Sequence, residues 1–255
     1  MNDLTLAEKA LKKLGITEPH EIDLEVVAWD QGAKIRMRPL VGCEARILGN
    51  GNKSIISIND QSSYERQRFS IGHELGHWNH HRGRDFVCRA ADIGSHGNRT
   101  RPEERQADEY SANLLMPNYI FTPLARSYRR LDFNTVKEIA DAFKTSLTAT
   151  AIRLIESNIF PAILICHGQG KRKWFKRAKD IPHKWFPRET LEIETKAFDV
   201  MFGEGVVDHR QHHVSAEAWF DRYGVDKYEV LEHSAKISDS TVLTLLEFDD
   251  DEMLD

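Results

Sequence analysis

Apolar residues repeat at helical spacing in one segment of the first half of the chain. Ile71, Leu75 and Trp78 stand at i, i+4 and i+7, so they share one face of a helix, and this face is expected to pack on a core. Gly72 and Gly76 interrupt the segment although each costs about 1 kcal/mol in helix propensity. The glycine pair at i, i+4 indicates that a neighbouring segment approaches this helix closely.

Capping signals predict where several helices begin. Ser62-Ser63-Tyr64-Glu65 has the form of a capping box with Ser62 as the N-cap, and Thr100-Arg101-Pro102-Glu103 is a second one with proline in the first turn. Thr5-Leu6-Ala7-Glu8 caps a first amphipathic helix that ends near Gly15. A second short helix is predicted over Leu24–Asp30.

Alternating polar and apolar residues predict a small sheet between these helices. The segments Lys34–Leu40, Cys43–Leu48 and Lys53–Asn59 read as strands, and residues 50–52 form a tight hairpin between the last two. The strand that ends at Asn59 leads directly into the helix with Ile71. It could present an exposed edge that holds an extended peptide; the alternative is an ordinary strand inside the sheet.

A pair of helices follows in the middle of the chain. A helix is expected after Pro117 to about Arg130, then one over Thr135–Phe143, a turn at 144–146, and another helix to Ser157, which is a helix-turn-helix in outline. The second helix of the pair offers Arg153 and little else to a DNA groove. A packing role is therefore favoured over DNA binding.

The remaining part reads as a separate module of mixed strand and helix. Ala162–Cys166 and Leu243–Phe248 are predicted strands of the buried type. The expected fold class is α+β. Its parts are an N-terminal domain at 1–130 with a small sheet and helices, a helix-turn-helix-like segment at 131–159, and a C-terminal module at 160–255 that senses a signal or binds a partner.

Two features of this module carry unassigned chemistry. Gly170–Arg177 and Lys184–Arg188 mix cations with aromatics, which could stack bases and neutralise phosphate; alternatively they are strands with aromatics in the core and lysines in water. His209, His212 and His213 have helical i, i+3, i+4 spacing and could hold a second metal, or could simply be solvated.

Composition narrows the class of protein. The chain has 255 residues, of which 40% are hydrophobic, and a net charge of −5, which argues against general affinity for nucleic acid. No apolar run approaches the roughly 20 residues that span a bilayer, and the N-terminus lacks the features of a signal peptide, so a cytoplasmic protein is expected. Cys43, Cys88 and Cys166 are widely spaced and suit reduced thiols.

The segment His73-Glu74-Leu75-Gly76-His77 adds metal chemistry to the first helix with a core stripe. Two histidines four residues apart lie on one helical face, so both rings can reach one zinc ion, while Glu74 can take a proton from a water there. A catalytic zinc needs a third protein ligand, for which we expect Glu104 at the start of the next helix. Asp108, one turn later, could accept the outer N–H of a ligating histidine. Manganese is a possible substitute for zinc.

Two segments together resemble a known family. RFSIGHELGH at residues 68–77 and ERQADEYSANLLMP at residues 104–117 are similar to the corresponding motifs of the ImmA/IrrE metallo-endopeptidases, an HExxH, gluzincin-like group. The resemblance implies a cytoplasmic peptidase with a thermolysin-like core that cleaves helix-turn-helix (XRE-type) transcriptional repressors and so derepresses stress-response or mobile-element genes.

The same resemblance assigns roles to individual residues. His73, His77 and Glu104 correspond to the metal ligands, Glu74 to the general base, and Asp108 to a position held by Asp or Asn. The implied partner is the repressor itself, without membrane association.

Other functions stay open at this stage. One is a regulator that binds DNA or a repressor without turnover, and another is a metal-dependent hydrolase that acts on something other than a protein. The presence of Glu74 argues against an inactive scaffold. The segment 80–99 carries further donors, His80, His81, Cys88 and His96, and a Cys88 thiolate could cap the open metal position.

Overall fold

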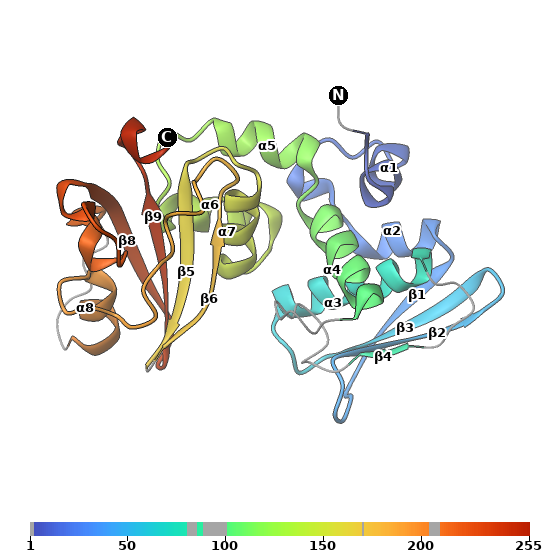
Figure 1. The fold of residues 1–255 in the computed structure, drawn as a ribbon. Helices are drawn as coiled ribbons and strands as arrows, with labels where there is room; N and C mark the ends of the chain where they lie inside the picture. The colour runs from blue at the N-terminus through green and yellow to red at the C-terminus, as the bar shows by residue number, and fades with distance from the viewer. Residues whose placement is uncertain (1–2, 81–85, 89–100, 170, 204–209) are drawn as a thin grey trace. The chain divides into compact units, whose positions relative to one another are not determined.

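Residues 3–80, 86–88, 101–169, 171–203 and 210–255 are described in a computed structural model of the chain (Figure 1). They form two compact units. Unit 1 consists of Met1–Pro123 and Ala140–Ser146, and unit 2 of Leu124–Ile139 and Leu147–Asp255. Each unit combines helices with its own sheet, so the α+β class predicted from the sequence is confirmed.

The N-terminal helices of unit 1 form where the sequence predicts them. Helix α1 spans Leu6–Lys13, and its capping box is complete because Thr5 Oγ1 accepts the Glu8 N–H at 3.2 Å while Glu8 Oε2 accepts the Thr5 N–H at 2.9 Å. A 3₁₀ turn at Pro19–Glu21 follows. Helix α2, Leu24–Asp30, then leads into the sheet.

The sheet of unit 1 has the strand order β1-β3-β2-β4. The strands are Ala33–Arg38, Ala45–Asn50, Lys53–Asn59 and Phe86–Cys88, numbered β1 to β4. Strand β3 pairs with β2 through the predicted hairpin and with β1 in parallel, so both of its edges are occupied. The expectation that the strand ending at Asn59 offers an exposed edge is therefore wrong, and the ordinary-strand alternative holds.

Helix α3, Tyr64–His80, buries its predicted apolar stripe but begins differently from the prediction. The buried stripe is Ile71, Leu75 and Trp78. Ser63 Oγ accepts the Arg66 N–H at 3.3 Å and so acts as the N-cap, whereas Ser62 Oγ donates to Glu44 Oε2 at 2.6 Å. The predicted cap is wrong by one residue because Glu44 engages the first serine hydroxyl.

Helix α4, Pro102–Leu115, also begins one residue later than its predicted box. Arg101 occupies the N-cap position without a side-chain bond, and Pro102 takes the first helical position, where its missing N–H costs nothing. Thr100, the expected cap, lies outside the described residues. The proline therefore sets this helix start.

Three more helices connect the two sheets along the chain. They are α5, Asn118–Arg126, α6, Phe133–Phe143, and α7, Leu147–Glu156. The turn between α6 and α7 falls at 144–146 as predicted, and Lys144 adopts a positive φ of 55° there. The helix-turn-helix outline is thus present in the order of elements, while its function stays a prediction.

The sheet of unit 2 is antiparallel, with the order β6-β5-β9-β8-β7. Its strands are β5, Ala162–Gly168, β6, Arg172–Arg177, β7, His212–Ser215, β8, Glu229–Ser238, and β9, Thr241–Glu247, with short 3₁₀ turns at Ala216–Ala218, Val225–Lys227 and Asp251–Met253. Helix α8, Lys196–Phe202, packs on one face, where buried Glu232 accepts the Ala197 N–H at 2.6 Å. On the other face, His233 Nδ1 accepts the Phe133 N–H at 3.0 Å.

Strand β7 overturns the idea of a second histidine metal site. His212 and His213 lie in this strand, so their side chains point to opposite faces of the sheet rather than along one helical face. His209 lies outside the described residues. Within the described part of the chain, no helix is both long enough and apolar enough to cross a membrane.

Candidate metal centre

Helices α3 and α4 approach each other through small residues. A Cβ atom added at Gly72 would lie 2.5 Å from Ser111 Oγ, and one added at Gly76 would lie 2.7 Å from Ala107 Cα. A Cβ atom does not come this close to a non-bonded heavy atom, so only glycine allows the observed spacing of the two helices. The close neighbour predicted from the glycine pair is α4.

This packing brings three potential metal donors together. His73 Nε2 and His77 Nε2 are 3.0 Å apart, and Glu104 Oε2 lies 3.2 Å from the first and 3.6 Å from the second. The exposed fractions of the three residues are 0, 1 and 7%. Two come from α3 and one from α4, so the cluster exists only when the helices are packed. These three residues could hold a metal ion.

The donor set fits zinc in both chemistry and size. Two imidazoles and one carboxylate are a known ligand set of catalytic zinc sites, which leave a fourth position open. Tetrahedral bonds of about 2.0–2.1 Å imply ligand atoms about 3.3 Å apart, and the three observed separations of 3.0, 3.2 and 3.6 Å bracket that value. The same donors also accept manganese.

The electrostatics of the cluster favour a positive charge. Burial opposes protonation of His73, but hydrogen bonds to Asp108 and Glu104 outweigh it and raise the pKa of the ring to about 9. For Glu104, burial raises the pKa, yet hydrogen bonds from His73 and His77 prevail and lower it to about 2. Carboxylates thus surround the ring nitrogens, as a site for a cation requires.

Asp108 contacts the outer side of the first histidine. Its Oδ1 lies 2.9 Å from His73 Nδ1, and one helical turn separates it from Glu104. A carboxylate in this place accepts the Nδ1–H, which directs the lone pair of Nε2 toward His77 and Glu104. The arrangement is the one expected for a residue that orients a ligand.

Glu74 is buried directly beside the cluster. Its exposed fraction is 0%, and its charge contributes to the raised pKa of His73. A carboxylate that is withdrawn from bulk water next to a cation site can exchange a proton with a water molecule there.

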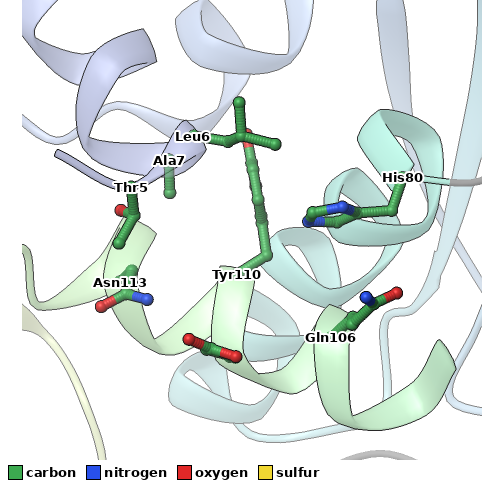
Figure 2. A pocket seen from close by; sticks show the side chains of 8 residues that line it. Thr5, Leu6, Ala7, His80, Gln106, Tyr110 and Asn113 are labelled. Atoms are coloured by element: carbon green, nitrogen blue, oxygen red, sulfur yellow. The ribbon is translucent and has the colours of Figure 1, made fainter. Parts of the chain in front are cut away.

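The opposite side of α4 lines a small hollow of about 160 Å³ (Figure 2). Its walls include Leu6 of α1, His80 of α3, and Gln106 and Tyr110 of α4. At about 100° per residue, Gln106 points away from the side of α4 that carries Glu104, so this hollow is separate from the donor cluster.

Tyr110 is held in a hydrogen-bond network that the sequence did not reveal. Its hydroxyl accepts from Gln31 Nε2 at 2.9 Å and from Asn79 Nδ2 at 3.2 Å, and burial raises its pKa to about 12. Gln31 is the residue that follows α2, and Asn79 lies in α3, so no local sequence pattern links the partners. This hydroxyl has a structural role in joining the three helices.

The additional donors expected near the site are only partly described. His80 lies at the end of α3 in the hollow, whereas His81, His96 and the side chain of Cys88 are outside the described residues. Cys43 and Cys166 are free thiols.

Comparison with known proteins agrees with this geometry. A family model described as the IrrE N-terminal-like domain, a peptidase family, matches residues 30–155. This part of the chain belongs to the ImmA/IrrE family. The matched range contains α3, α4 and all donors of the cluster, so the chain carries a metallopeptidase-like domain. Among curated proteins, nothing matches.

A solved structure shares the fold beyond that domain. A transcriptional regulator from Mycobacterium tuberculosis superposes with a TM-score of 0.60 and 12% sequence identity over 95% of this chain and 74% of that chain. At this identity the similarity concerns the fold alone.

Proposed function

We propose that this chain is a zinc-dependent endopeptidase with a thermolysin-like core. The observation that carries the proposal is the convergence of His73, His77 and Glu104 from two packed helices, with buried Glu74 beside them. His73, His77 and Glu104 hold the metal, Glu74 is the general base, and Asp108 orients His73. Membership of residues 30–155 in a peptidase family supports the same reading.

The residues divide the work of peptide hydrolysis. A bound zinc ion supplies Lewis acidity, which polarises a carbonyl and lowers the pKa of water toward about 7. Glu74 accepts a proton from the attacking water and then delivers it to the leaving amine. Asp108 keeps the proton of His73 on Nδ1, so that Nε2 faces the other donors. The burial of the cluster keeps competing water away from the charged groups.

The substrate we propose is a helix-turn-helix repressor of the XRE type, whose cleavage derepresses stress-response or mobile-element genes. Two findings support this assignment. Residues 30–155 belong to the ImmA/IrrE family, and a transcriptional regulator shares the fold of most of the chain.

The test uses the full chain and the helix-turn-helix repressor encoded beside its gene. Incubation with zinc or manganese should convert the repressor into two fragments, which mass spectrometry identifies. Glu74→Gln should lower kcat by about 10² to 10⁴ with little change in metal binding, because general-base catalysis contributes that much. Glu65→Gln, a matched change in the first turn of the same helix, should leave cleavage unaltered.

Each outcome separates the candidate functions. Cleavage that persists in Glu74→Gln would refute the assignment of the base. Stable binding of the repressor without cleavage under either metal would instead favour a regulator without turnover.

A further inference from the structure

Residues from the two segments that mix cations with aromatics, 170–177 and 184–188, line one cavity of about 410 Å³ in unit 2. Phe175 and Arg177 come from the first segment and Phe186 from the second, although ten residues lie between the two phenylalanines. Its remaining walls are Ala178, Lys179, Ile181 and His183. None of the described residues that line the cavity is acidic, so this wall is cationic and aromatic in a chain of net charge −5.

An irregularity in the sheet gathers the cations and the rings on one face. Ile163 and Ile165 of β5 pair with Arg177 and Phe175, and His167 pairs with Arg172 because the register shifts by one residue at Lys173. Since directly opposed residues project to the same side, Arg172, Phe175 and Arg177 share the face of the sheet on which the cavity lies. Without the shift, Arg172 would point to the other face.

Arg172 contacts both aromatic rings of the cavity wall. Its guanidinium lies 5.1 Å from the centroid of Phe175 and 4.7 Å from that of Phe186, and it donates to the carbonyl oxygens of Pro187 and Arg188. The two rings meet edge to face at 5.2 Å. Phe186 is nevertheless 58% exposed. Charged side chains on an edge strand such as β6 can serve to prevent unwanted pairing, but that role requires no aromatic ring in water.

Arg177 retains donors that the protein does not use. Its Nη1 donates to His183 Nδ1 at 2.8 Å and its Nη2 to the Trp185 carbonyl oxygen at 3.0 Å. Its Nε is buried and has no hydrogen-bond partner among the described residues. A guanidinium has five N–H bonds, so one on each Nη has no acceptor among the described residues, besides the buried Nε–H, and a donor without an acceptor is costly.

We propose that this cavity binds a nucleoside phosphate. The exposed ring of Phe186 offers a stacking surface for a planar base, because every base has a π-face. The unused Nη donors of Arg177 and the ammonium of Lys179 offer charge-assisted bonds to phosphate oxygens. An uncharged ring would leave the cationic groups without an anion, and an anion alone would leave the aromatic surface without a partner. A ligand that joins a ring to an anion contacts both.

A free nucleotide fits the cavity better than a nucleic-acid strand. Its volume falls in the range of about 300–1,000 Å³ that is usual for small-molecule sites. The net charge of −5 opposes a long polyphosphate backbone. The ligand would therefore act as a signal received by unit 2, independently of peptide hydrolysis by unit 1.

Binding is tested by calorimetric titration of the full chain with adenosine 5′-monophosphate. The comparison ligands are adenosine, which lacks the phosphate, inorganic phosphate, which lacks the ring, and a short single-stranded oligonucleotide. We expect the monophosphate to bind at least about tenfold more tightly than either half. The assay reports binding alone, so its result does not depend on whether the chain cleaves a repressor.

Variants at exposed positions locate the site without endangering the fold. Phe186→Ala should weaken binding of the monophosphate by about fivefold or more, whereas Tyr223→Ala, at another exposed aromatic of unit 2, should not. Lys179→Met should weaken binding of the monophosphate but not of adenosine, whereas Lys236→Met, at an exposed lysine of β8, should change neither.

Three results would overturn the proposal. They are absence of binding by the monophosphate, equal loss in the cavity variants and their controls, and an oligonucleotide that binds far more tightly than the monophosphate. The last result would assign the surface to single-stranded nucleic acid instead.

Discussion

Replacing Gly76 by alanine tests whether the packing of α3 on α4 sets the geometry of the donor cluster. The new Cβ would lie 2.7 Å from Ala107 Cα, whereas carbon atoms in contact are about 3.5–4.0 Å apart. The obstructing atom belongs to the backbone, so no rotamer change relieves it. The two helices must therefore separate by about 1 Å.

That displacement is large relative to the tolerance of a metal site. Glu104 lies 3.2 and 3.6 Å from the nitrogens of His73 and His77 across the same helix pair. Metal–ligand distances tolerate about ±0.2 Å, so we expect the affinity for zinc to fall at least about tenfold. Overpacking costs about 1–3 kcal/mol in the free energy of unfolding, and the better helix propensity of alanine offsets about 1 kcal/mol of it.

The assay is a zinc titration in competition with a chromogenic chelator, accompanied by urea unfolding of the metal-free chain. Gly72→Ala provides the comparison, because its closest obstacle is the side chain of Ser111 at 2.5 Å. Adding Ser111→Gly to that variant should recover most of the zinc affinity, whereas Ala107→Gly should not rescue Gly76→Ala. If Gly76→Ala binds zinc with the Kd of the parent chain, helix packing does not set the site and the reasoning fails.

Two further predictions concern charged and titrating groups. Asp108→Asn should weaken zinc binding about 10- to 100-fold by removing the charge behind His73, whereas the matched change Glu109→Gln on an exposed position should not; equal Kd values would contradict this. Burial, assisted by the charge of Arg172, lowers the pKa of His167 from 6.5 to about 4. Between these values only the unfolded state binds the proton. The contribution of His167 to the free energy of unfolding is therefore fully present above about pH 6.5, and up to about 3 kcal/mol of it is lost as the pH approaches 4. Urea unfolding at pH 7 and pH 4.5 should show this loss, and His167→Gln should remove it; an unchanged pH dependence would disprove the contribution.

Much of the fold follows from local patterns that the sequence displays directly. The stripe of Ile71, Leu75 and Trp78, the hairpin at 50–52 and the bounds of α2 depend on neighbours within a few residues, and all agree with the structure. The spacing of His73 and His77 likewise determined that both rings share a helical face.

The errors arise where a distant residue competes with a local partner. Glu44 accepts a hydrogen bond from the hydroxyl of Ser62, so Ser63 acts as the N-cap instead. Strand β1 pairs in parallel with the edge of β3, and no tight turn in the sequence predicts this pairing. The meeting of Phe175 with Phe186 has the same cause, because sheet register and the path of a long loop decide it. Helical spacing misled at His212, which lies in a strand.

The extra residue at Lys173 decides which face of β6 carries Arg172. Side chains in a regular strand alternate with a period of two, and Arg172 stands three positions before Phe175, so only the unpaired residue between them places both on one face. Deleting Lys173 would give a regular strand in which Arg172 still pairs with His167 and still faces the rings. Homologous chains with a regular strand here should therefore keep the arginine beside the rings only if it stands two positions before the first phenylalanine instead of three.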